Sequence, residues 1–196
     1  MAGTLTLPGK ASDLLEWWRD ERGERAMPDV SRISPLALRR WIGDVSIMHL
    51  HDGPRRFWIA LHGGNAVRHI GPDFHLKYLE DVVPEAAQAV ALAPYRAAAA
   101  LGVPTYSTLL PTLQNHVTWP LERMALPFAG DDGRPARFVV WVAPNERCAH
   151  DVDEVYEFES EALFPMHEAR VHLLRDGGFE RIEADWGAAR TVALAA

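Results

Sequence analysis

Residues 121–143, LERMALPFAGDDGRPARFVVWVA, contain the strongest strand and turn signals of this 196-residue chain. The run ARFVVWVA at their end is the most hydrophobic of the chain and predicts a central strand, Ala136–Ala143. A second strand, His116–Pro127, precedes it, and Asp131-Asp132-Gly133 between the two is a turn signal. We therefore expect an antiparallel hairpin in the middle of a sheet.

Three further segments have the composition of strands: Val45–His51, Arg56–His62 and Pro104–Leu113. Asp52-Gly53 separates the first two and is typical of a hairpin turn. Residues 65–83 have a mixed pattern with short helical turns, a longer helical pattern follows, and both fall between the second and third strands. This order predicts an α+β fold, in which a five-stranded antiparallel sheet carries its helices on one face.

Residues 84–101 predict the longest helix between these strands. Pro84 can open the helix and Gly102 can close it. Pro94 lies in its interior, where proline removes a backbone hydrogen bond and clashes with the preceding turn. We therefore expect this helix to be bent.

Segments on both sides extend this core. Before it, a helix capped by Ser12 ends at Gly23, and a short helix follows Pro35. After it, residues 151–169 are acidic and partly helical in pattern, and a hairpin follows around Asp176-Gly177-Gly178. We divide the chain into an N-terminal helical extension (1–43), a core (44–144) and a tail with helix and hairpin (145–196).

The stretch LLEWWRDERGERAMPDVSRISPLAL (14–38) resembles the opening of a bacterial PAS-like family, PAS_5. Members begin with an aromatic helix, a Gly-Arg-x-x-Pro turn and Ile-x-Pro-Leu. The matching residues here are Trp18, Gly23, Arg25, Pro28, Ile33, Pro35 and Leu36, with Glu24 inserted after the glycine. LERMALPFAGDDGR (121–134) resembles the closing hairpin of the family, with Glu122, Arg123 and Pro127 matching.

The resemblance runs from about Leu14 to Val142. It departs from the family pattern at Gly64 and His75, where threonine is more usual. It implies a PAS fold and a sensing or regulatory role, often without an attached output domain. It does not imply a particular ligand.

Composition excludes several function classes. The net charge is −7 and no basic stripe is present, which argues against nucleic acid as a partner. No apolar run reaches the roughly 18–20 residues of a membrane span, and the start lacks the pattern of a secretion signal. The single cysteine, Cys148, excludes an internal disulfide. We therefore expect a cytoplasmic protein.

Aromatic residues on the predicted strands are the candidate ligand-binding residues. Trp58, Trp119 and Trp141 would line an apolar cavity if they point toward the helices, with Tyr106 and His116 as polar tips. The alternative is a filled core that holds no ligand. A separate set, Leu14, Trp17 and Trp18, is the expected interaction surface if the N-terminal helix is not fully buried.

The residues identify no cofactor. GGNAVRHIG (63–71) resembles a flavin photosensor motif, but Ala66 stands where adduct chemistry needs a cysteine. A haem needs an axial side chain, but the predicted helix at 84–101 contains no histidine, and His69 and His75 lie before it in the chain. His49 and His51 share a strand face, yet zinc needs a third ligand. We predict no metal site.

No motif of a familiar catalytic class is present. We interpret Glu122-Arg123 as the solvated side of a sheet. We therefore predict a stand-alone sensory domain, not an enzyme, that acts on a signalling partner through small-molecule binding or protein contact and forms a homodimer. Two alternatives stay open: a ligand-free interaction adaptor, and a small enzyme with His116 and Glu122 as candidates.

Overall fold

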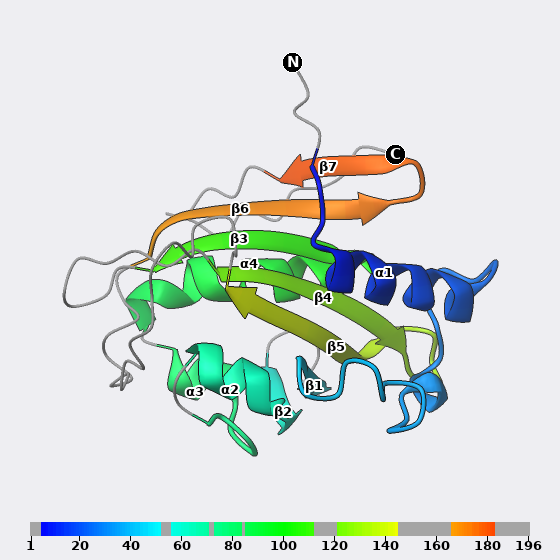
Figure 1. The fold of residues 1–196 in the computed structure, drawn as a ribbon, viewed down its shortest axis with the longest axis horizontal. Coiled ribbons are helices and arrows are strands. Elements are labelled where there is room, and N and C mark those ends of the chain that lie inside the picture. The colour runs from blue at the N-terminus through cyan, green and yellow to red at the C-terminus, as the bar shows by residue number, and fades with distance from the viewer. Residues whose placement is uncertain are drawn as a thin grey trace.

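The computed structural model describes residues 5–51, 56–70, 73–83, 85–111, 121–144 and 166–182. Its helices are α1 (Gly9–Arg22), the short 3-10 helix η1 (Val30–Arg32), α2 (Gly64–Ile70), α3 (Leu79–Val82) and α4 (Glu85–Leu101). Its strands are β1 (Val45–His51), β2 (Arg56–Leu61), β3 (Thr105–Pro111), β4 (Leu121–Ala129), β5 (Pro135–Pro144), β6 (Met166–Arg175) and β7 (Gly178–Ile182). The strands form one sheet in the order β2-β1-β5-β4-β3-β6-β7, and every pair is antiparallel (Figure 1).

The prediction of a five-stranded PAS-like sheet is wrong, because the sheet has seven strands. The α+β class is right, and α2, α3 and α4 do fall between the second and third strands. The additional strands come from the tail hairpin: β6 pairs with β3, where Thr105 lies opposite Leu173 and Ser107 opposite Val171. Without β6, the backbone groups along one edge of β3 would be unpaired, and such an edge readily accepts another strand.

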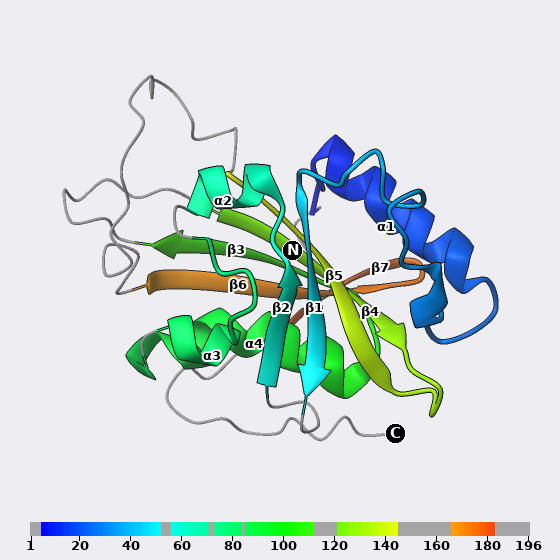
Figure 2. The same cartoon turned by 90° about the horizontal axis from the view of Figure 1, so that it is seen from below.

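Helices cover both faces of the sheet, because α1 of the N-terminal extension packs on the face opposite α3 and α4. Figure 2 shows α1 on one side of the sheet and α3 and α4 on the other. We call these the α1 face and the α4 face. The α1 face carries a buried cluster that includes Tyr106, Met124, Leu126, Val139 and Trp141. The α4 face carries a second cluster that includes Met48, Phe57, Ala125, Phe138 and Val140.

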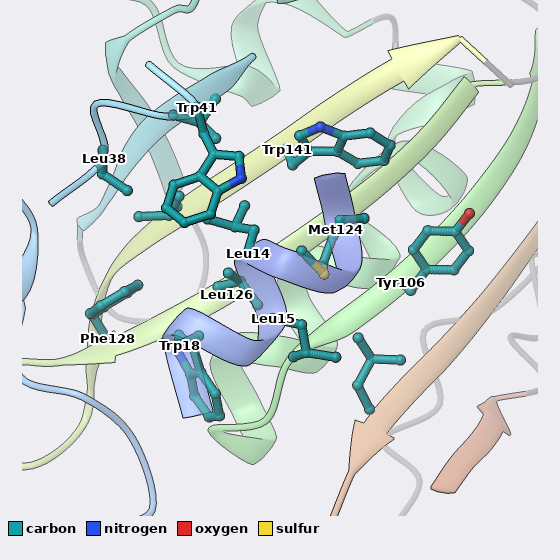
Figure 3. Close-up of a cluster of buried hydrophobic side chains, with 14 of the residues drawn as sticks. Leu14, Leu15, Trp18, Leu38, Trp41, Tyr106, Met124, Leu126, Phe128 and Trp141 are labelled. Carbon is teal, nitrogen blue, oxygen red and sulfur yellow. The ribbon is translucent and has the colours of Figure 1, made fainter. Parts of the chain in front are cut away.

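Helix α1 is fixed to the sheet by its apolar side. Leu14, Leu15 and Trp18 are almost fully buried against the strands (Figure 3). The indole nitrogen of Trp18 also donates a hydrogen bond to the carbonyl oxygen of Pro127 at 2.8 Å. The helix begins at Gly9, before the predicted cap Ser12, and ends as predicted at Gly23, whose φ of 57° suits glycine.

The other predicted elements are confirmed only in part. Strand β1 has the predicted bounds, and the β4–β5 hairpin turns at residues 131–133 as predicted. The short helix expected after Pro35 is absent, since residues 35–44 form turns. Helix α4 continues through Pro94 without a break. The Asp52-Gly53 turn and residues 151–165 of the predicted acidic helix lie outside the described residues.

None of the helices in the described ranges is both long and apolar enough to span a lipid bilayer.

Candidate anion-binding site

Small residues bring α4 close to the sheet. Ala87, Ala91 and Ala98 are buried on the side of the helix that meets the α4 face, where Leu92 and Tyr95 pack beside them. Alanine adds little bulk and favours the helix, so the backbone of α4 can approach the strands closely. Main-chain carbonyl groups of α4 therefore come within reach of side chains on β3 and β4.

Arg123 on β4 projects into this interface and is only 8% exposed. Its Nη1 donates to the carbonyl oxygen of Ala91 at 2.9 Å, and its Nε donates to Oγ of Ser107 at 3.3 Å. The guanidinium carbon lies 5.1 Å from the ring centroid of Tyr95, a cation–π distance. The guanidinium is thus held between one helix and two strands.

The second terminal nitrogen of Arg123, Nη2, is buried and has no hydrogen-bond partner among the described residues. No described carboxylate forms an ion pair with this guanidinium. Burial lowers the pKa of Arg123, while the charge interaction and the side-chain hydrogen bonding with Tyr95 act in the opposite direction. Arginine nevertheless remains protonated in proteins. The interface therefore contains a buried positive charge with one donor group unused.

Pro94 contributes to this arrangement from inside α4. Proline has no N–H to give to the carbonyl four residues earlier, which is that of Val90. The carbonyl oxygen of Ala91 accepts from Arg123, and that of Pro94 accepts from Oγ1 of Thr105 at 3.0 Å. Side chains of the sheet thus donate to two carbonyl groups in the middle of α4, those of Ala91 and Pro94.

The interpretation of Glu122-Arg123 as a solvated pair is wrong. Glu122 is 7% exposed and Arg123 is 8% exposed. Neighbouring residues on a strand point to opposite faces, so Glu122 lies on the α1 face and Arg123 on the α4 face. Strand β4 is central and covered on both faces, which explains the burial of both side chains. The sequence signal for this site was a charged pair inside an otherwise apolar strand.

Two of the predicted ligand-binding residues, Tyr106 and Trp141, lie together on the α1 face. Met124 lies between them in register (Figure 3). On the other side of Tyr106, His172 of β6 is its partner in register. Tyr106 and Trp141 are 1% and 3% exposed and belong to the cluster that α1 covers, not to the interface with α4. Nε1 of Trp141 and Nδ1 of His172 are buried without hydrogen-bond partners in the described part of the chain.

The other predicted ligand-binding residues are placed elsewhere. Trp58 on β2 contacts His49 and His51, with ring centroids 5.3 and 5.7 Å apart, and Nδ1 of His51 lies 2.9 Å from the hydroxyl of Tyr78. His116 and Trp119 fall outside the described residues. Within the described ranges, no three His, Cys, Asp or Glu side chains are grouped as metal ligands.

The predicted interaction residues on α1 differ in their exposure. Leu14 and Trp18 are 0% and 2% exposed, so neither side chain is accessible to a partner. Trp17 is half-buried, and its ring lies 5.9 Å from that of Trp41 and 5.8 Å from that of Phe128. Only Trp17 of this set keeps part of its surface open.

No protein-family model, curated protein or solved structure matches this chain.

Proposed function

We propose that this chain is a sensory or regulatory domain that binds a small monocarboxylate at Arg123, between α4 and the sheet. The observation that carries the proposal is the buried guanidinium whose Nη2 has no partner among the described residues. A buried charge without an ionic partner costs several kcal/mol of folding free energy, so such a group is retained more readily where an anion can join it. The resemblance of residues 14–142 to the PAS-like family supports a sensing role.

The charge balance favours a carboxylate over a phosphate. Arg123 supplies one positive charge, and its Nη2 and the hydroxyl of Ser107 are the donors available on this side of the sheet. A carboxylate carries one negative charge and accepts two such hydrogen bonds. A phosphate dianion would bring a second charge into an interface that has no second described cation.

The position of the site suggests how binding is relayed. Arg123 is buried beneath α4 and bonded to its backbone, so a ligand that binds Nη2 has to alter the contact between α4 and the sheet. A ligand shifts such an equilibrium only through its different affinities for the two arrangements. We propose that an occupied site favours a different α4 position, which a partner protein recognises.

Native mass spectrometry of the freshly purified full chain tests this proposal. We expect the wild type to retain a small anionic molecule, and Arg123→Met to lose it. Arg134→Met, which changes an exposed arginine in the β4–β5 turn, should retain it. If wild type and Arg123→Met both give the mass of the bare chain, also after incubation with acetate, the proposal fails and a ligand-free adaptor is the better interpretation.

A further inference from the structure

A groove lies on the outer side of α1, away from the site at Arg123. It has a volume of about 520 Å³ and runs between α1 and the turns at residues 34–41, which lie side by side in Figure 2. Trp17 and Trp41 line the groove, and their ring centroids are 5.9 Å apart. Leu36 on its rim is 70% exposed, an unusually open position for a large apolar side chain.

The two walls of the groove carry opposite charges. Asp13, Glu16 and Asp20 lie on the α1 wall at helical spacing, and Arg39 and Arg40 lie on the other wall. One pair closes across the groove, since Nη2 of Arg40 is 3.6 Å from Oδ2 of Asp13. Among the described residues, Glu16, Asp20 and Arg39 form no ion pair.

We infer that this groove is the contact surface between two copies of this chain. A two-fold axis places the acidic wall of one copy against the basic wall of the other, so each Arg39 can meet Glu16 and Asp20 of its partner. The same operation offers the exposed side chain of Leu36 to the tryptophan-lined groove of the other copy. A surface that carries both a protruding apolar side chain and a matching groove, and both signs of charge, complements itself.

This surface is independent of ligand binding, because none of its residues contacts Arg123. Its charged residues are better positions than Trp18 for a test of association. Trp18 is buried and donates a hydrogen bond to the carbonyl oxygen of Pro127, so replacing Trp18 would disturb folding. The charged residues of the groove are exposed, and changing them should leave the fold intact.

A charge-swap series measured by analytical ultracentrifugation tests the inference. We expect wild type to reach about twice the chain mass of 21.9 kDa as its concentration rises, and less so at high salt. Arg39→Glu alone, and Glu16→Arg with Asp20→Arg, should each weaken the dimer roughly tenfold or more, because like charges then face each other. Combining all three changes in one chain should restore it.

The control is Arg68→Glu on α2, an exposed arginine outside the groove, which should dimerise as wild type does. Circular dichroism spectra and unfolding curves should be alike for all variants. A wild type that stays monomeric at every concentration overturns the inference. A dimer that ignores the charge reversals overturns it as well, because association would then use another surface.

Discussion

Nη1 of Arg123 donates to the carbonyl oxygen of Ala91 at 2.9 Å, which joins the central strand β4 to the middle of α4. The bond connects a buried cation to a helix that contains Pro94 and therefore has incomplete internal hydrogen bonding. It gives α4 a polar attachment inside an otherwise apolar interface.

Tyr95 should stabilise the Arg123 charge through its ring. The guanidinium lies 5.1 Å from the ring centroid, and a desolvated cation–π contact contributes about 2 kcal/mol. In a double-mutant cycle of Tyr95→Leu and Arg123→Met, we expect a coupling free energy of about 1–2 kcal/mol from urea unfolding. The cycle cancels the cavity that Tyr95→Leu creates on its own. A coupling near zero would mean that the ring only fills space.

Trp18→Phe should destabilise the fold more than Trp17→Phe. The first change leaves the carbonyl of Pro127 without its 2.8 Å hydrogen bond in a buried position, which costs about 1–3 kcal/mol. Trp17 contributes ring contacts that phenylalanine largely keeps, so we expect less than about 1 kcal/mol. Equilibrium unfolding in urea compares the two, and equal losses would contradict the assigned role of the Trp18 bond.

Leu173→Ala should show that the tail hairpin belongs to the core. Leu173 on β6 is 2% exposed and lies opposite Thr105 on β3. Truncating a buried leucine costs about 2–5 kcal/mol, whereas Leu36→Ala at a 70% exposed position should cost less than about 0.5 kcal/mol. Both are measured as changes in the free energy of unfolding. A negligible loss at Leu173 would mean that the hairpin folds apart from the sheet.

Stability should fall as acid protonates His62. Burial lowers the pKa of His62 below 6.5, although Asp73 opposes this shift. The backbone N–H of Phe74 donates to Nδ1 at 3.1 Å, which requires that nitrogen to be unprotonated. The unfolded chain then binds the proton more readily, so this stabilisation is present above the unfolded pKa and is lost as pH falls through the folded pKa.

His62→Asn provides the matched comparison. The amide oxygen of asparagine can accept from Phe74 without titrating. We expect the free energy of unfolding of the wild type to drop more steeply than that of the variant between about pH 7.5 and pH 5.5. Parallel curves would contradict the depressed pKa.

The sequence predicted individual strands better than their assembly. Strand β1 and the turn at residues 131–133 were found because alternation and turn residues act locally. The hairpin of β6 and β7 was also recognised, but its pairing with β3 depends on an edge that is visible only once the sheet has formed. Because of this long-range pairing, the hairpin assigned to a separate tail forms two strands of the sheet.

The candidate site was harder to predict. Alternation along a strand indicates which residues share a face of the sheet. It does not indicate which face α1 or α4 covers, so it could not assign Tyr106 and Trp141 to either helix. Both proved to lie beneath α1. The burial of Arg123 requires β3, β5 and α4 together, which no local pattern contains. The resemblance marked Glu122 and Arg123 as matching positions without indicating that either is buried.

Thermal unfolding of protein freed of any retained anion, with and without acetate, tests the claim about Arg123 most directly. At an acetate concentration about 100-fold above the dissociation constant, linkage predicts about 2.7 kcal/mol of stabilisation, or roughly 5–10 °C in Tm. Sodium chloride at equal ionic strength should not reproduce the shift, and inorganic phosphate should give less. We predict that Arg123→Met, without acetate, unfolds at or above the wild-type temperature and gains nothing from acetate, while Arg134→Met responds as wild type does. An equal acetate shift in Arg123→Met, or none in the wild type, would contradict the account.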